Sequence, residues 1–214
     1  MEGYNYIAVE GAIGSGKSIL VNALAKRLSA EIIQTPADDN PFLLQFYRDP
    51  KHYAFPAQIF FLLTRYRLLS KLFELDLFHQ SAVSDFIFER DKLFARLFLD
   101  EAELRLYYQV EQHLRKDIPS PKLVIFLQCP VEILVRNIAN SERQLEKKYI
   151  TEDFISTLAK QYTNFFFDWK KTPLLVVDRA TVHFDNPEQL NELVDYIIST
   201  SITGQQYYSV STLL

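Results

Sequence analysis

Gly11-Ala-Ile-Gly-Ser-Gly-Lys-Ser18 is the stretch that decides the fold, because it matches the pattern G-x-x-x-x-G-K-[ST] without a gap. Glycines at this spacing let the backbone turn tightly, so that successive N–H groups point at phosphate oxygens. Three of the five glycines in the chain lie in this loop. A strand predicted over residues 4–9 precedes the loop and a helix predicted over residues 17–28 follows it, which is the context that such a loop requires. The sequence therefore predicts that this segment binds the phosphates of a nucleotide.

The two residues that end the loop have separate roles in nucleotide binding. Lys17 would place a positive charge near the outer phosphates, and the Ser18 hydroxyl would complete the coordination shell of a magnesium ion. The helix that begins here adds the positive end of its dipole. The predicted nucleotide-binding residues are Gly11, Ala12, Ile13, Gly14, Ser15, Gly16, Lys17 and Ser18.

Asp85 is the second candidate for the site, because it ends the predicted buried strand 81–85. The carboxyl ends of parallel strands meet at one edge of a sheet, so this carboxylate should lie near the phosphate-binding loop. It can bind magnesium, directly or through water, or act on a substrate hydroxyl. Aspartate is also a good N-cap for a following helix. Both interpretations stay open, and the presence of the loop in the same sheet favours the functional one.

The rest of the chain alternates strand patterns with helical ones. Further strands are predicted at 30–34, within 119–128 and at 174–177, the last of these being the final strand. Helices are predicted at 55–77, 92–98, 102–114, 131–140 and 187–199, with Pro41 in the first turn of another and Thr151 as the N-cap of one more. Segment 141–148 is charged, without a predicted helix. This order predicts an α/β fold, a parallel sheet with helices on both faces, as a single domain over 1–199 followed by a tail at 200–214 of unknown role.

Composition narrows the function classes. The 214 residues are 48% hydrophobic and 14% aromatic, and the net charge is −4. This charge disfavours nucleic acid and anionic membranes as partners, since no basic surplus is available. Cys129 is the single cysteine, so the chain can form no internal disulfide and no cysteine-rich metal site. With no signal-peptide pattern and no apolar stretch of about 20 residues, we expect a cytoplasmic protein.

These residues resemble the deoxynucleoside kinases, especially the bacterial deoxyadenosine/deoxyguanosine kinase branch. The similarity runs from Tyr6 to about Ile198. It is carried by an ordered set of motifs: Glu10–Ser18, Asn40-Pro-Phe-Leu43, Phe46-Tyr47, Tyr53-Ala-Phe-Pro-Ala-Gln58, Arg65, Ser84-Asp85, Phe94-Ala95, and Arg143 with Glu146. The resemblance implies the P-loop kinase fold, ATP as phosphoryl donor, Mg²⁺ as cofactor, a deoxynucleoside as acceptor, and a homodimer.

The same resemblance implies roles for individual residues. Gln58 would bond the edge of the nucleobase, and Asp91 would lie near the base. Tyr47 and Glu146 would hold the sugar 3′-hydroxyl, and Arg65 would sit close to the groups that read the base and accept the phosphate. An amide side chain suits a base edge, because it offers a donor and an acceptor together. The implied catalytic residues are Lys17, Asp85 and Arg143, with Ser18 and Asp85 binding the metal.

The sequence also departs from the family pattern. The general base of the family is a glutamate after the second strand, and Thr35 occupies that position here. Threonine takes up no proton at neutral pH; either of the aspartates at 38–39 could substitute through a shift of the loop. Phe86 replaces the arginine that follows the acidic residue, an aromatic that related bacterial sequences share. In the lid, Asn137 and Ser141 stand where arginines would contact the adenine and the transferring phosphate.

Three functions remain open on this basis. The first is a deoxynucleoside kinase that phosphorylates the 5′-hydroxyl, with an activity that Thr35 at the general-base position would reduce. The second is a nucleotide-binding homologue that serves as a regulatory or dimer partner. The third is a kinase for a nucleoside monophosphate, which is disfavoured because segment 40–65 has few basic residues for a second phosphate. The dimer would pack through helices within 55–114, although the same apolar faces would also suit a core.

Overall fold

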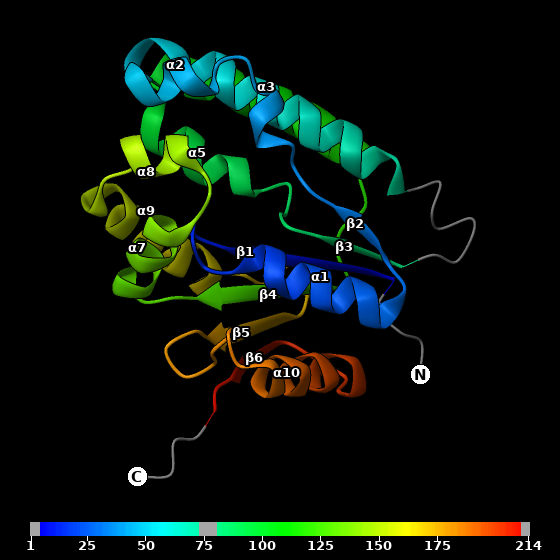
Figure 1. Cartoon of the computed structure of the whole chain (residues 1–214). Coiled ribbons are helices and arrows are strands. Elements are labelled where there is room, and N and C mark those ends of the chain that lie inside the picture. Colours follow the sequence, from blue (N-terminus) through cyan, green and yellow to red (C-terminus); the bar gives the residue numbers. More distant parts are fainter. Residues whose placement is uncertain (1–4, 73–80, 211–214) are drawn as a thin grey trace. The chain divides into compact units, whose positions relative to one another are not determined.

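The computed structural model describes residues 5–72 and 81–210 (Figure 1). Tertiary contacts divide the chain into two compact units. The first comprises Met1–Ile32, His79–Ile87 and Ser120–Leu214, and the second comprises Ile33–Phe78 and Phe88–Pro119. The single domain with a separate tail stays a prediction. Within the described ranges, no helix is long and apolar enough to cross a membrane.

A parallel sheet forms the centre of the first unit. Its strands are β1 (Tyr6–Gly11), β2 (Glu31–Ile33), β3 (Ala82–Ser84), β4 (Leu123–Gln128), β5 (Leu174–Asp178) and β6 (Gln205–Tyr208). The spatial order is β2-β3-β1-β4-β5-β6. Each pair of strands with a defined register is parallel, as between β1 and β3 and between β5 and β6. The prediction that 174–177 is the last strand is therefore wrong, because β6 adds an edge strand beside β5.

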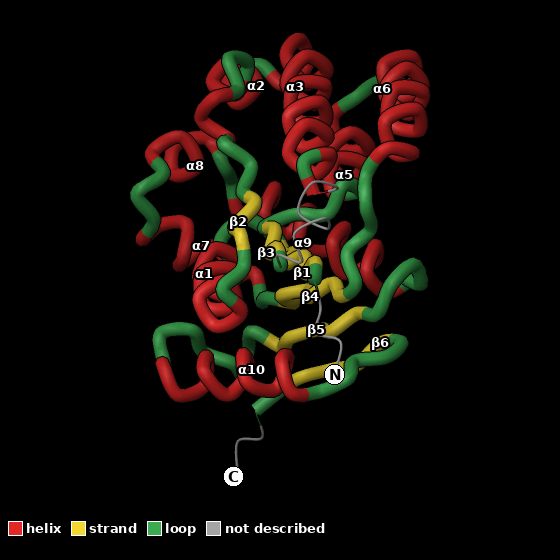
Figure 2. Tube along the Cα trace, turned by 90° about the vertical axis from the view of Figure 1, so that its right-hand side faces the viewer, coloured by secondary structure: helices red, strands yellow, loops and turns green. Residues whose placement is uncertain are grey.

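Helices cover both faces of this sheet, as predicted (Figure 2). The helices of the first unit are α1 (Lys17–Leu28), α7 (Val131–Asn140), α8 (Gln144–Tyr149), α9 (Glu152–Phe167) and α10 (Pro187–Ser199). On one face, Leu20 of α1 and Leu193 of α10 pack in one buried cluster with Ile125 of β4. On the other face, Phe126 of β4 stacks on Phe166 of α9, with ring centroids 4.5 Å apart. The consecutive residues Ile125 and Phe126 of β4 thus point to opposite faces of the sheet, and each packs against the helices on its own face.

The second unit is helical. It contains η1 (Ala37–Asp39), α2 (Leu43–Arg48), α3 (Pro50–Ser70), α5 (Arg90–Phe98), α6 (Glu101–Leu114) and η2 (Arg115–Asp117). Phe46 of α2 packs with Ala54 and Ala57 of α3, and its ring meets that of Phe98 edge-on.

Two predicted helix starts in this unit are corrected. Helix α2 begins at Leu43, so Pro41 lies in the turn before it and not in its first turn. Helix α3 begins at Pro50 instead of residue 55, because proline is well suited to the first position of a helix. The predicted end of α3 near residue 77 lies outside the described residues.

Candidate active site

The phosphate-binding loop, Gly11–Ser18, joins the carboxyl end of β1 to the first turn of α1. Gly14 and Gly16 have φ angles of 85° and 93°, which favour glycine strongly. Space restricts both positions as well. A Cβ on Gly14 would lie 2.8 Å from the Leu134 carbonyl oxygen, and one on Gly16 would lie 2.9 Å from the Phe184 ring. The loop therefore has the left-handed turns and close packing that its sequence predicts.

Lys17 lies in the first turn of α1 and folds back over the loop. Its Nζ donates to the carbonyl oxygens of Gly11 at 2.8 Å and Ala12 at 3.1 Å. The ammonium is thus held at the mouth of the loop, on the side where the N-terminus of α1 adds positive potential. This geometry suits the binding of an anionic group such as a phosphate.

Glu10 fixes the start of the loop, a role that the sequence did not reveal. Its carboxylate is fully buried and accepts from the backbone N–H of Gly11 at 3.1 Å and of Ile87 at 2.8 Å. Ile87 follows β3 by three residues, so one carboxylate joins the loop to the segment that carries Asp85. Both oxygens accept backbone hydrogen bonds, which makes Glu10 a structural group and a poor candidate for a general base.

Two further side chains bond the carbonyl groups of the loop. Asn137 Nδ2 donates to the Gly14 oxygen at 2.8 Å, and Arg179 Nε donates to the Ser15 oxygen at 3.2 Å. The Arg179 guanidinium also stacks on Phe184, 3.5 Å from the ring centroid. Burial lowers the pKa of Arg179 from its ordinary value, but arginine stays protonated at neutral pH. Sequence reasoning had singled out Asn137 only as a departure from the family pattern, and it missed Arg179.

The two predicted metal-binding residues follow neighbouring strands, Ser18 after β1 and its loop and Asp85 after β3. Ser18 is exposed in the first turn of α1, and the partly buried Asp85 directly follows β3. Because Ala8 of β1 pairs with Ser84, the last residue of β3, Asp85 leaves the sheet beside the C-terminal end of β1, from which the loop begins. Among the described residues, no group of three or more His, Cys, Asp or Glu forms a metal cluster. One hydroxyl and one carboxylate fit Mg²⁺, which proteins often bind through few side chains and the phosphates of a nucleotide.

Arg143 and Glu146 form an ion pair across the first turn of α8. The distance from Arg143 Nη1 to Glu146 Oε1 is 2.8 Å, with Arg143 largely exposed and Glu146 buried. The structure thus brings together the predicted lid arginine and the residue predicted to hold the sugar. Ser141, the other lid position, donates its hydroxyl to the Ile138 carbonyl at the end of α7. Segment 141–148, which lacked a predicted helix, contains all but the last residue of α8.

In the second unit, Arg65 of α3 joins two of the predicted positions. Its Nε donates to the Thr35 hydroxyl at 3.0 Å, and its Nη1 pairs with Asp91 of α5. Both charged side chains are almost fully buried, and the Arg65 guanidinium also lies over the Phe61 ring at 5.1 Å. The residue at the expected general-base position is therefore bonded to a cation. Sequence reasoning placed Arg65 near these groups but did not foresee the Thr35 contact.

Gln58 lies on α3 and is 2% exposed. Its Oε1 accepts no hydrogen bond within the part of the chain that the structure describes. An unsatisfied buried amide oxygen costs free energy, so such an atom commonly indicates a ligand-binding position. Tyr47 of α2 is partly buried beside Phe46, with ring centroids 5.7 Å apart. Gln58, Arg65, Asp91 and Tyr47 all belong to the second unit, whereas Glu146 belongs to the first.

Comparison with known proteins identifies the family. The family model described as deoxynucleoside kinase matches residues 7–202. The chain belongs to the deoxynucleoside kinase family. Among curated relatives, the deoxyguanosine kinase of Bacillus subtilis (strain 168) is 30% identical over 158 residues, covering 73% of this chain and 76% of that protein. The deoxyadenosine/deoxycytidine kinase of the same organism is 27% identical and covers 94% of each chain.

Solved structures agree with this family. The structure of deoxyadenosine kinase from M. mycoides with bound dCTP is 26% identical and has a TM-score of 0.72, covering 88% of this chain and 96% of that one. The structure of that enzyme with bound dATP, 24% identical, has a TM-score of 0.78 and supports the fold alone. The P-loop kinase fold and the family resemblance drawn from the sequence are confirmed.

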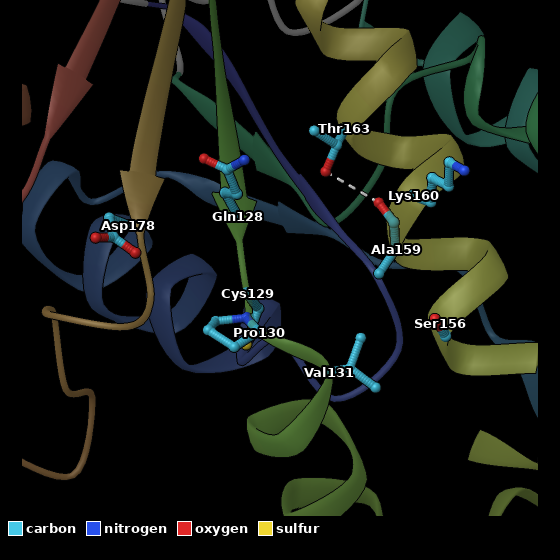
Figure 3. A pocket seen from close by; sticks show the side chains of 9 residues that line it. All are labelled: Gln128, Cys129, Pro130, Val131, Ser156, Ala159, Lys160, Thr163 and Asp178. Atoms are coloured by element: carbon cyan, nitrogen blue, oxygen red, sulfur yellow. Dashed lines mark hydrogen bonds between the residues drawn. The ribbon is translucent and has the colours of Figure 1, made fainter. Parts of the chain in front are cut away.

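In this member of the deoxynucleoside kinase family, a pocket of about 410 Å³ also lies in the first unit. Figure 3 shows it between the ends of β4 and β5, which contribute Gln128 and Asp178, and α9, which contributes Ser156, Lys160 and Thr163. None of the site residues predicted from the sequence lines it. Burial of Cys129, also in the lining, raises the pKa of its thiol to about 11.

Proposed function

We propose that this chain transfers the γ-phosphoryl group of ATP to the 5′-hydroxyl of a deoxynucleoside, releasing ADP and the 5′-monophosphate. The observation that carries the proposal is the phosphate-binding loop. Its left-handed glycines, the N-terminus of α1 and the Lys17 ammonium bonded to the Gly11 carbonyl all support the binding of a polyphosphate. Family membership supports the transferase chemistry.

In this reaction the nucleoside 5′-oxygen attacks the γ-phosphorus, and the bond from that phosphorus to the oxygen bridging it to the β-phosphorus breaks. The electron pair stays with ADP, and the hydroxyl proton leaves for an acceptor. Lys17 and the loop amides would stabilise the charge that moves onto the β- and γ-phosphate oxygens. Ser18 and Asp85 would hold Mg²⁺, which would supply charge neutralisation. Arg143 would add positive charge from α8.

The second unit supplies the predicted residues for the base. The Gln58 amide, with its unsatisfied buried oxygen, would bond the base edge. The buried ion pair of Arg65 and Asp91 presents a fixed donor and acceptor set, and Asp91 Oδ2 also accepts no hydrogen bond from the described residues. Tyr47 and Glu146 would hold the sugar 3′-hydroxyl. Comparing product formation from the four deoxynucleosides identifies the preferred base.

The contact between Thr35 and Arg65 favours a second candidate function, a catalytically weakened homologue that binds nucleotide as a regulatory or dimer partner. The Thr35 hydroxyl accepts a hydrogen bond from Arg65 and takes up no proton at neutral pH. Loss of a general base costs roughly 10²–10⁴-fold in rate where the base matters. For this candidate function, we expect a protein that binds ATP tightly and turns it over slowly.

One assay separates the two functions. Purified protein with ATP and Mg²⁺ is incubated with each of the four deoxynucleosides, and the 5′-monophosphate product is quantified by chromatography. The kinase proposal predicts product with at least one nucleoside, and at least about 100-fold less product from the Lys17→Met variant. Binding of ATP in a calorimeter without product from any nucleoside, at high protein concentration, would instead support the weakened homologue.

The oligomeric state and location follow from the same proposal. We propose a homodimer acting in the cytoplasm, on the resemblance and the composition described above. Sedimentation equilibrium of the purified protein tests the dimer, since a mass equal to one chain of 25.0 kDa at micromolar concentration would contradict it.

A further inference from the structure

Two consecutive carbonyl groups of the phosphate-binding loop accept hydrogen bonds from side chains outside the motif. The Gly14 oxygen accepts from Asn137 of α7, and the Ser15 oxygen accepts from Arg179, the residue after β5. The donors lie 123 and 164 positions further along the chain. All four residues belong to the first unit. The loop is therefore held by side chains from two different segments.

Holding a carbonyl oxygen also orients the amide that follows it. In a trans peptide the C=O and the next N–H point in opposite directions, and the described residues contain no cis peptide bond. Fixing the Ser15 oxygen against Arg179 thus turns the Gly16 N–H away from Arg179. Fixing the Gly14 oxygen against Asn137 does the same for the Ser15 N–H, which donates to Ala12 and closes the turn within the loop. The two side chains restrict two successive peptide planes of the loop.

Arg179 is itself held rigidly enough for this role. It is 6% exposed, its Nη1 donates to the Val182 carbonyl, and its guanidinium carbon lies over the Phe184 ring, 3.5 Å from the centroid. That ring also contacts the loop, because it leaves no room for a Cβ on Gly16. An arginine can make these directional contacts together, whereas a lysine ammonium is a point charge.

We propose that Arg179 and Asn137 are positioning residues for nucleotide binding, which act by fixing the peptide planes of Gly14, Ser15 and Gly16. The inference rests on the proposed binding of ATP by this loop. It gives Asn137, which departs from the family pattern, a function of its own in this chain. It also predicts that binding of the nucleoside is independent of both residues.

The test compares four variants by calorimetry with ATP and Mg²⁺ and by steady-state kinetics. Arg179→Ala and Asn137→Ala remove one hydrogen-bond donor each, and Arg179→Lys keeps only the charge. Arg27→Ala is the matched control, since this arginine of the same unit forms an exposed ion pair with Asp195. We expect the Kd and KM for ATP to rise about 10–100-fold in Arg179→Ala, since a hydrogen bond to a charged donor is lost. Asn137→Ala should raise them about 3–10-fold, with Arg179→Lys intermediate and the control unchanged.

Two readouts separate positioning from a general loss of structure. The KM for the deoxynucleoside should stay within about twofold in every variant that folds. Guanidinium at about 20 mM, far below the molar concentrations that denature proteins, should recover part of the ATP affinity of Arg179→Ala and leave the wild type and Arg27→Ala unchanged.

The outcomes are distinct. If the wild type binds no ATP, the proposed function fails together with this inference. If the wild type binds ATP and the Arg179 and Asn137 variants bind it equally well, the inference alone is wrong. A parallel loss of affinity for ATP and nucleoside, without guanidinium rescue, also overturns it. Should Arg179→Ala fail to fold, Arg179→Lys and Asn137→Ala carry the same test.

Discussion

Replacing Gly14 by alanine tests the loop geometry most directly. A residue with a Cβ pays roughly 1–2 kcal/mol for the left-handed conformation, and the φ of Gly14 is 85°. The added Cβ would also meet the Leu134 carbonyl oxygen of α7 at 2.8 Å and Ile138 Cγ1 at 3.1 Å. Backbone of a packed helix yields little, and overpacking of this kind costs about 1–3 kcal/mol. We expect Gly14→Ala to lose about 2–5 kcal/mol of unfolding free energy.

Gly204 provides the matched control. Its φ is 61°, but a Cβ there would have no atom within 4 Å. Gly204→Ala should therefore lose only the conformational part, about 1 kcal/mol. With an m value near 2 kcal/mol/M, the urea midpoint should fall by about 1–2.5 M for Gly14→Ala and by about 0.5 M for Gly204→Ala.

The same measurement with nucleotide links stability to function. A ligand present at 100 times its Kd stabilises the folded state by about 2.7 kcal/mol. The wild type and Gly204→Ala should gain this increment with ATP and Mg²⁺, and Gly14→Ala should gain much less, because its loop is displaced. Equal midpoints for the two alanine variants, or an equal gain from ATP, would refute the reasoning.

Three further perturbations extend the test. Lys17→Met should lower product formation at least about 100-fold in the chromatographic assay, since the charge at the phosphates is lost; unchanged activity would exclude the loop as the active site. Thr35→Glu places a carboxylate beside Arg65, where it stays ionised, and should raise kcat about 10–100-fold if the missing base limits the rate; no rise would show that it does not. Burial raises the pKa of the Cys129 thiol to about 11, so alkylation by iodoacetamide should be slow at pH 8 and accelerate as the pH approaches 11; rapid alkylation at pH 8 would contradict that burial.

The elements that sequence predicted best are those with strong local signals. The predicted bounds of α1 and α10 match the structure, because a left-handed glycine precedes the first and Asn186, followed by a proline, caps the second. Thr151 caps α9 as predicted, accepting from the Phe154 N–H. Helix α8 and strand β6 were not predicted, because contacts with other segments stabilise them more than their own sequence pattern does. The four residues of β6 alternate between exposed and half-buried, and the strand forms by pairing with β5.

The same distinction applies to the site. The eight loop residues could be recognised because their chemistry depends on spacing within one turn. The carboxylate of Glu10 and the side chain of Arg179 could not, since they act on backbone groups 77 and 164 positions away. No periodicity or composition encodes such a contact, which exists only once the strands have paired. The ion pair of Arg65 and Asp91 became visible only when α3 packed on α5.

The contact at Thr35 indicates which residues should control the rate of phosphoryl transfer in this chain. Its hydroxyl accepts from Arg65 and is not a base at neutral pH, so proton removal gains no general base from this residue. Transfer of a phosphoryl group passes through a loose transition state in most analyses, in which positioning and charge matter more than a base. The loop is accordingly the most constrained part of the site, with Glu10, Asn137 and Arg179 each bonded to its backbone. It follows that Lys17→Met should cost more activity than Thr35→Glu restores, and the reverse ranking would place the control of rate at the base.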